Sequence, residues 1–254
     1  EFRVECMDWT GGQIGNNDSA DDVRDVDLNQ VHYLSGPIGV EGAEPGDLMV
    51  VEILDVGTFE ESQWGFNGIF PEARKSIWDF HGIYTTSRHI PDVKFAGIMH
   101  PGLIGCLPSK ELLETWNERE TGLIATEPDR VPPLACPPEV ASAVVGKLTG
   151  EAAEKAKAEG ARTVPPRGNC DIKNLTKGST VYFPVYVKDG GLSMGDLHFS
   201  QGDGEITFCG AIEMAGYLDI KVSLIKDGMK KYGVKNPIFK PSVLTPTYKD
   251  YVIF

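Results

Sequence analysis

The chain has 254 residues, a formal net charge of −13 and a hydrophobic content of 41%. This length and composition are typical of a folded globular protein. The negative charge argues against nucleic acid and anionic membrane surfaces as partners, because both are bound mainly through clustered Lys and Arg side chains. No apolar run approaches the roughly 20 residues needed to cross a bilayer. We therefore expect a soluble, cytoplasmic protein.

The cysteines point to the same compartment. They are odd in number, widely spread and form no C-x-x-C pair, so a disulfide framework is not indicated. We interpret each as a reduced, small apolar side chain rather than as a nucleophile or zinc ligand. The five are Cys6, Cys106, Cys136, Cys170 and Cys209.

Short alternating runs predict strands along most of the chain. The first covers residues 2–7, and others at 48–54 and 180–188 are bordered by glycine and proline turns. Between 205 and 226, two alternating apolar series favour two antiparallel strands that turn near Gly216. The overall pattern predicts a β-rich α+β fold.

Two segments have the pattern of helices instead. Ser109 can cap a helix over residues 110–118, whose apolar side chains recur on one face. Residues 151–159 are rich in Ala, Glu and Lys and predict a second, mostly polar helix at the surface.

The strongest chemical signal lies in residues 195–205. If the first half is a strand, Asp196 and His198 point to the same face, and a carboxylate beside an imidazole suits zinc or another divalent ion. The glycines that follow permit a tight turn, which can return Asp203 or Glu205 to the same point. An ordinary hairpin turn beside a hydrogen-bonded histidine explains these residues about as well, because a functional zinc site needs at least three protein ligands.

Two further segments can contribute to such a site. His100 precedes a glycine-rich turn at Gly102, where backbone N–H groups can face an anion or a developing oxyanion. Asn169 and Asp171 place an amide and a carboxylate on either side of Cys170. Residues of these types also occur often in turns with no catalytic role. The remaining histidines are interpreted as structural: His32, His81 and His89.

Together these motifs resemble the acetamidase/formamidase family. The likeness extends over nearly the whole chain, and its motifs follow one another in order at residues 12–18, 35–47, 78–80, 100–105, 169–171 and 195–205. The first and third of these segments are similar to the formamidase branch in particular. The resemblance implies a mixed β-sandwich with few helices, and hydrolysis of formamide, or of acetamide, to a carboxylate and ammonia.

The resemblance also implies a divalent metal ion, with zinc as the first candidate and calcium as the second. Asp171, Asp196 and His198 are the implied metal-site residues. A small amide is the implied substrate, and a homo-oligomer is the implied assembly.

The implied catalytic residues are Glu205, Asp171 and His100. Gly102 and Asn169 are the implied contacts to the substrate or its oxyanion. Which carboxylate is a metal ligand and which is the base is left open by the sequence.

Some features depart from the family pattern. Formamidases of this kind usually read Arg-Glu-His-Gly-Gly-Asn-Cys-Asp before the metal segment, whereas Arg167 here directly precedes Gly168, so a possible histidine ligand is missing. A longer glycine-rich loop is also common between Phe66 and Pro71. Because the chain begins and ends in strand-like runs, we expect residues 1–254 to be a single catalytic domain in a fragment that lacks both termini and some loops.

Two alternative functions stay open at this stage. Cys170 beside Asp171 is the one candidate for a nucleophilic cysteine, although no Glu-Lys-Cys constellation accompanies it. A non-catalytic, β-rich binding module stabilised by a metal at the Asp-Gly turn is the second alternative.

Overall fold

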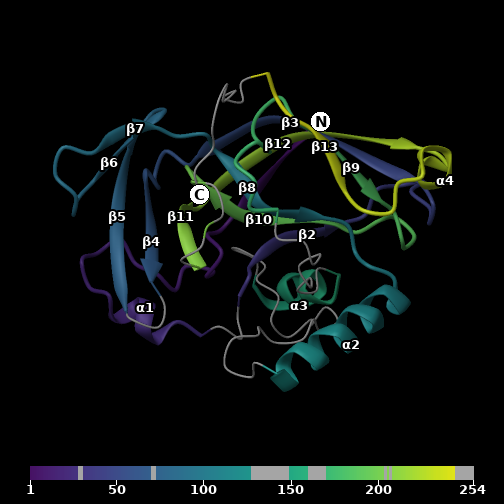
Figure 1. Ribbon diagram of the computed structural model, residues 1–254, viewed down its shortest axis with the longest axis horizontal. Helices are drawn as coiled ribbons and strands as arrows, with labels where there is room; N and C mark the ends of the chain where they lie inside the picture. Colours follow the sequence, from purple (N-terminus) through teal and green to yellow (C-terminus); the bar gives the residue numbers. More distant parts are fainter. Residues whose placement is uncertain are drawn as a thin grey trace.

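The computed structural model describes residues 1–27, 31–69, 73–126, 149–159, 170–202, 205 and 208–243. These residues form two β-sheets and four helices, so the predicted β-rich fold with few helices is confirmed. Figure 1 shows the sheets as the body of the molecule, with α2 (Lys110–Thr126) and α3 (Gly150–Glu159) on one side of it.

The smaller sheet is antiparallel throughout and has the order β1-β12-β3-β9-β13. Its strands include the three predicted at 2–7, 48–54 and 180–188, with ends moved by a few residues. The bounds are β1 Phe2–Cys6, β3 Leu48–Thr58, β9 Thr180–Pro184, β12 Gly216–Ile225 and β13 Ile238–Lys240.

The larger sheet has the order β2-β10-β11-β4-β5-β6-β7, and β8 pairs with β10. One edge of β10 pairs first with β2 and then with β11, whereas β8 runs along the other edge. The bounds are β2 Leu34–Ile38, β4 Trp64–Ile69, β5 Arg74–His81, β6 Tyr84–Ser87, β7 Lys94–Ala96, β8 His100–Gly105, β10 Leu192–His198 and β11 Phe208–Met214.

A single apolar core joins the two sheets. Met194 and Leu197 of β10 both belong to it, although an alternating strand would place residues three apart on opposite faces. The strand is irregular between them, since Asp196 has a positive φ of 52°. As a result, Asp196 and His198 leave the core and lie on the outer face of the larger sheet.

A second apolar cluster covers part of that outer face. Trp9, Ile14 and Val23 come from the N-terminal segment that includes α1 (Asp21–Asp25). They pack with Phe66 and Cys209 of the larger sheet. The N-terminal segment therefore shields from water the face on which Asp196 and His198 lie.

The prediction for residues 205–226 was right about the strands and wrong about their pairing. β11 and β12 meet at Ala215, but they belong to different sheets and are not hydrogen-bonded to each other. Ile212 of β11 and Leu218 of β12 enter the same core from opposite sides. The chain therefore crosses between sheets here instead of forming a hairpin, because both apolar series are needed on the two sides of one core.

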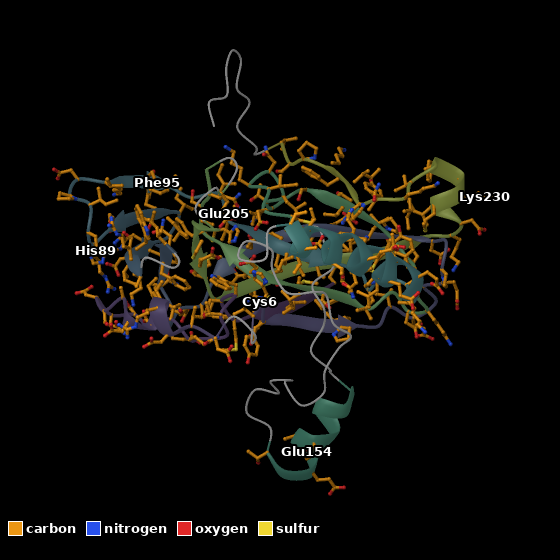
Figure 2. The ribbon with its side chains drawn as sticks, turned by 60° about the horizontal axis from the view of Figure 1, so that its bottom comes forward. Cys6, His89, Phe95, Glu154, Glu205 and Lys230 are labelled. Atoms are coloured by element: carbon orange, nitrogen blue, oxygen red, sulfur yellow. The ribbon has the colours of Figure 1, made fainter. Side chains whose placement is uncertain are left out.

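The helix predictions hold with changed bounds. The amide of Leu112 donates to Ser109 Oγ over 3.1 Å, as expected of a cap, but α2 continues to Thr126. α3 matches its prediction, and Figure 2 shows it, with Glu154, set apart from the sheets. A fourth helix, α4, spans Gly228–Tyr232. No helix among the described residues is long and apolar enough to span a bilayer.

The predicted burial of the cysteines holds for three of the four that the structure describes. Cys6, Cys106 and Cys209 are buried, Cys170 is half-buried, and all four are free thiols. Cys136 and the strand-like run at 251–254 lie outside the described residues.

Candidate active site

Backbone packing brings the chemical groups of β8 and β10 close together. A Cβ atom at Gly102 would lie 2.7 Å from Asp196 Oδ2 and 2.7 Å from His198 Cε1. Such contacts are too short for any larger residue, so the glycine allows β8 to pair closely beneath these two side chains. Its predicted contact to the substrate oxyanion remains a prediction.

Carboxylates surround one nitrogen of His198. The Nε2 atom lies 3.3 Å from Asp196 Oδ1, 3.2 Å from Glu213 Oε2 and 4.0 Å from Asp171 Oδ1. Ligand atoms of Asp171, Asp196 and His198 all lie within 4.8 Å of one another, and so do those of His198, Glu205 and Glu213. We call these five residues the carboxylate cluster.

The opposite nitrogen of His198 is held by Gln201. Gln201 Nε2 donates to the carbonyl of Asp171 over 2.7 Å, which turns its Oε1 toward two imidazoles. Oε1 lies 2.9 Å from His198 Nδ1 and 3.0 Å from His100 Nε2. If His198 Nδ1–H donates to this oxygen, Nε2 is the nitrogen presented to the carboxylates.

His100 lies behind His198 rather than in the cluster. Its ring is fully buried, its Nδ1 lies 2.7 Å from the carbonyl of Ile98, and its Nε2 lies 3.3 Å from His198 Nδ1. Burial and the neighbouring His198 lower the pKa of His100 to about 4. The structure therefore gives His100 contacts that orient His198.

Ionisation in the cluster is strongly coupled. Burial opposes a charge on His198 most strongly, but Glu213 and Asp196 outweigh it and raise the pKa of the imidazole well above its ordinary value. Burial also works against ionisation of Asp196, but His198 outweighs it and lowers the pKa of that carboxyl to about 2. In the metal-free protein these two groups form an ion pair, which a bound cation would replace because only an unprotonated imidazole nitrogen can act as a ligand.

The other three carboxyls are shifted in the opposite direction. Burial raises the pKa of Glu205 to about 7 and, together with Asp196, raises the pKa values of Asp171 and Glu213. One imidazolium cannot compensate four carboxylates, so the cluster has an excess of negative charge when its acids are ionised.

The buried atoms of the cluster fit a cation. His198 Nε2 and Glu213 Oε2 are both buried, and neither has a hydrogen-bond partner despite their short separation. Unpartnered buried polar atoms are rare in native proteins. A divalent cation takes imidazole nitrogen and carboxylate oxygen as ligands, so the described residues can hold such an ion.

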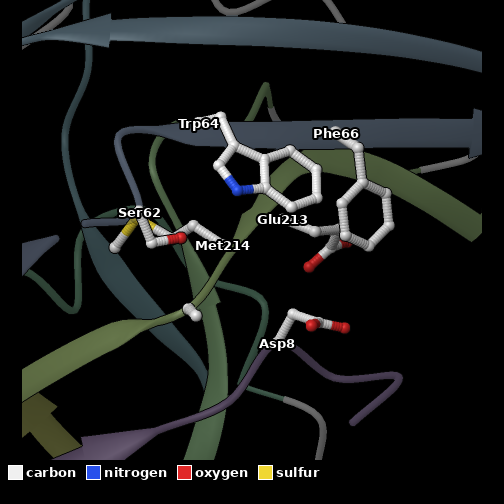
Figure 3. A pocket seen from close by; sticks show the side chains of 7 residues that line it. Asp8, Ser62, Trp64, Phe66, Glu213 and Met214 are labelled. Carbon is white, nitrogen blue, oxygen red and sulfur yellow. The ribbon is translucent and has the colours of Figure 1, made fainter. Parts of the chain in front are cut away.

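A small cavity adjoins the cluster at Glu213. Figure 3 shows the carboxyl groups of Asp8 and Glu213 facing one another, with the rings of Trp64 and Phe66 beside them. The space open to the centres of water-sized groups is about 20 Å³. The remaining lining residues are Ser62, Met214 and Ala215.

The structure brings most of the predicted site residues together. Asp171, Asp196, His198 and Glu205 share one cluster, whereas Asn169 lies outside the described residues. Sequence reasoning missed Glu213. Its signal was a glutamate between two apolar residues of a strand, which is more often a solvent-facing position.

Sequence comparisons assign this arrangement to a known family. The model of the Acetamidase/Formamidase family matches residues 1–254. The chain belongs to this family.

Acetamidase/formamidase relatives are similar along the whole chain. A formamidase from Methylophilus methylotrophus is 80% identical, with 100% of this chain and 66% of that protein covered. An acetamidase from Mycolicibacterium smegmatis is 56% identical over 100% of this chain and 68% of that protein. The chain thus spans about two thirds of the length of these relatives.

A solved structure agrees with the fold. A gamma lactamase from Delftia acidovorans has a TM-score of 0.82 and 66% identity, covering 99% of this chain and 66% of that one. An acetamidase from Bacillus halodurans is more distant, with a TM-score of 0.58 and 26% identity over 88% of this chain and 61% of that one.

Proposed function

We propose that this acetamidase/formamidase family member hydrolyses short amides, formamide and acetamide first among them, to a carboxylate and ammonia. The observation that carries the proposal is the convergence of four carboxyl groups on one buried imidazole nitrogen. The names of the relatives, formamidase and acetamidase, support an amide as substrate.

We propose that Asp171, Asp196 and His198 hold a divalent ion, with zinc preferred over calcium because an imidazole is among the ligands. Such an ion supplies Lewis-acid chemistry, since it lowers the pKa of a water molecule and polarises a carbonyl group. Gln201 fixes which nitrogen of His198 faces the ligand position.

Glu205 is the proposed base. Its pKa of about 7 lets it accept a proton near neutral pH. It takes a proton from the attacking water as the C–O bond forms, and that proton passes to the nitrogen as the C–N bond breaks. One amide and one water thus yield one carboxylic acid and one ammonia.

Ammonia release tests the proposal. The protein, supplied with zinc, is mixed with formamide, acetamide and propionamide, and ammonia is measured before and after treatment with a chelator. We expect activity that is lost with the chelator and restored by the metal. A His81→Gln variant is a suitable control, since His81 is exposed and outside the cluster. Absence of ammonia from all three amides would favour the non-catalytic binding module.

The cysteine alternative is less well supported. Burial raises the pKa of the Cys170 thiol to about 11, which disfavours the nucleophilic thiolate. We expect activity to survive alkylation of accessible thiols. Inactivation by alkylation together with resistance to chelators would reverse this assignment.

The assembly and the compartment are also proposals. Exposed apolar side chains near β6 and β7, among them Ile83, Tyr84 and Phe95, support a homo-oligomer. Light scattering after size-exclusion chromatography gives the number of subunits. The free thiols support the cytoplasm, which cell fractionation tests.

A further inference from the structure

The cavity beside the carboxylate cluster presents two acceptors to one small space. Asp8 is nearly buried and is held by its own loop, where Thr10 N donates over 2.8 Å and Gly12 N over 3.1 Å. Glu213 is 2% exposed, and its Oε2 accepts no hydrogen bond although His198 Nε2 lies 3.2 Å away. Because a buried acceptor without a donor is costly, the chemistry of the cavity favours a ligand that donates.

The cavity also sets an upper limit on size. Its 20 Å³ exceeds the roughly 10–15 Å³ that one water requires, so the space between the two carboxyl groups holds a group of about that size. Trp64, Phe66 and Met214 form its apolar side. An amino group fits such a space, whereas an alkyl group on the nitrogen would contact these side chains.

The acceptor groups and the small size of the cavity together favour the nitrogen end of an amide substrate. An –NH₂ group or an ammonium ion brings several N–H donors to the oxygens of the two carboxyl groups, whereas a carbonyl oxygen brings only lone pairs and can be bound only by a carboxyl that keeps its proton. We propose that this cavity is the subsite for the unsubstituted amide nitrogen and for the ammonium ion released from it, with Asp8 as the residue that selects primary amides. This inference rests on the proposed function, because it assigns the nitrogen end of that substrate.

Substitution of Asp8 tests the donor and acceptor chemistry. Asp8→Asn replaces one acceptor with an N–H₂ donor at nearly constant volume. We expect KM for formamide to rise about tenfold or more, in line with the loss of a hydrogen bond to a charged group, and kcat to change less. Asp92→Asn, at an exposed position, is the matched control. An unchanged KM in a folded Asp8→Asn protein would overturn the assignment.

Substitution of Trp64 tests the size limit of the cavity without changing a charged residue. Trp64→Leu enlarges the cavity, so we expect the rate with N-methylformamide, relative to formamide, to rise about tenfold. An effect of this size is usual when an enzyme distinguishes two substrates that differ by one methylene group. Trp116→Leu removes the same volume from α2, outside the cavity, and should leave the ratio unchanged. Wild-type protein that hydrolyses both amides equally well contradicts the subsite.

Direct binding separates this inference from the proposed function. Ammonium chloride and methylammonium chloride are titrated into wild-type and Asp8→Asn protein by calorimetry. Preference for ammonium that weakens about tenfold in Asp8→Asn supports the subsite even if no amide is hydrolysed. Hydrolysis of formamide with no preference between the two cations, and no effect of Asp8→Asn, keeps the proposed function and removes the subsite.

Discussion

Two buried carboxylates in this protein are equally hidden from solvent and differ in their partners. Asp47, immediately before β3, is 3% exposed, and Glu213 in β11 is 2% exposed. Asp47 pairs with Lys226 and accepts the backbone N–H groups of Glu44 and Asp227, each over 2.9 Å. Glu213 Oε2 has no hydrogen-bond partner.

The ionisation of the two groups follows from this difference. Burial opposes the charge on Asp47 most strongly, but Lys226 and the backbone donors outweigh it and lower the pKa. For Glu213 burial wins, and the pKa lies well above its ordinary value. A satisfied carboxylate stabilises a fold, whereas an unsatisfied one beside an imidazole and further carboxylates is typical of a functional site.

The largest expected effect is a contrast between two neighbouring residues of β10, His198 and Leu197. His198→Ala removes the centre of the carboxylate cluster, and we expect amidase activity to fall by about 10³-fold. Leu197→Ala leaves the cluster intact but creates a void in the core, which should lower the free energy of unfolding by about 2–5 kcal/mol. Ammonia release and urea denaturation of both variants check this. If the two variants lost equal activity per folded molecule, the two faces of β10 would not differ in function.

The next comparison tests the two buried carboxylates themselves. Glu213→Gln keeps the shape but removes an ionisable carboxyl group from the cluster, so we expect activity to fall by about 10²-fold with little change in stability. Asp47→Asn should lower the free energy of unfolding by about 1–3 kcal/mol while activity is preserved. Steady-state kinetics and chemical denaturation measure both. A Glu213→Gln protein with normal kinetics would assign Glu213 to structure.

Two glycines give a smaller contrast. In Gly102→Ala the new methyl group displaces Asp196 and His198, and we expect activity to fall about tenfold, since small misplacements of catalytic groups are costly. At Gly122 of α2, an added Cβ meets nothing within 4 Å. Gly122→Ala should therefore stabilise the helix by about 0.5–1 kcal/mol without affecting activity. Full activity in Gly102→Ala would show that the cluster tolerates displacement.

A further contrast concerns pH and the metal-free protein. The pKa of Glu205 rises from 4.5 to about 7 on folding, so between these values the folded state binds more protons than the unfolded state. Stability should then fall as pH rises from 4.5 to 7. The difference from Glu205→Gln isolates this group and should amount to about 1–2 kcal/mol. Parallel denaturation curves at pH 5 and 7 measure it, and a wild-type protein that gains stability relative to the variant over this range contradicts the sign.

The sequence predicts those parts of the site that follow from local geometry. Asp196 and His198 are two residues apart in a strand, and the structure places the two side chains in contact even though the strand is irregular at Asp196. The start of α2 at Ser109 follows equally from a local hydrogen bond. Glu205, which the sequence placed within reach of these residues, also belongs to the cluster.

Other parts depend on contacts between distant segments. Glu213 becomes buried because the N-terminal segment, through Trp9 and Val23, covers the outer face of the larger sheet. No local pattern in β11 indicates that cover, since an alternating strand with glutamate normally faces water. The crossing between sheets at Ala215 is equally hard to predict from sequence. The residues that begin a hairpin turn resemble those that begin a crossover between two sheets.

Metal content tests the central claim most directly. Wild-type protein and His198→Ala are incubated with zinc, dialysed together and analysed by inductively coupled plasma mass spectrometry. We predict that the wild type retains stoichiometric zinc and that His198→Ala retains at least tenfold less, since loss of a ligand weakens binding even more than loss of its supporting hydrogen bonds. A wild-type protein that hydrolyses formamide while it retains no divalent ion would contradict the account.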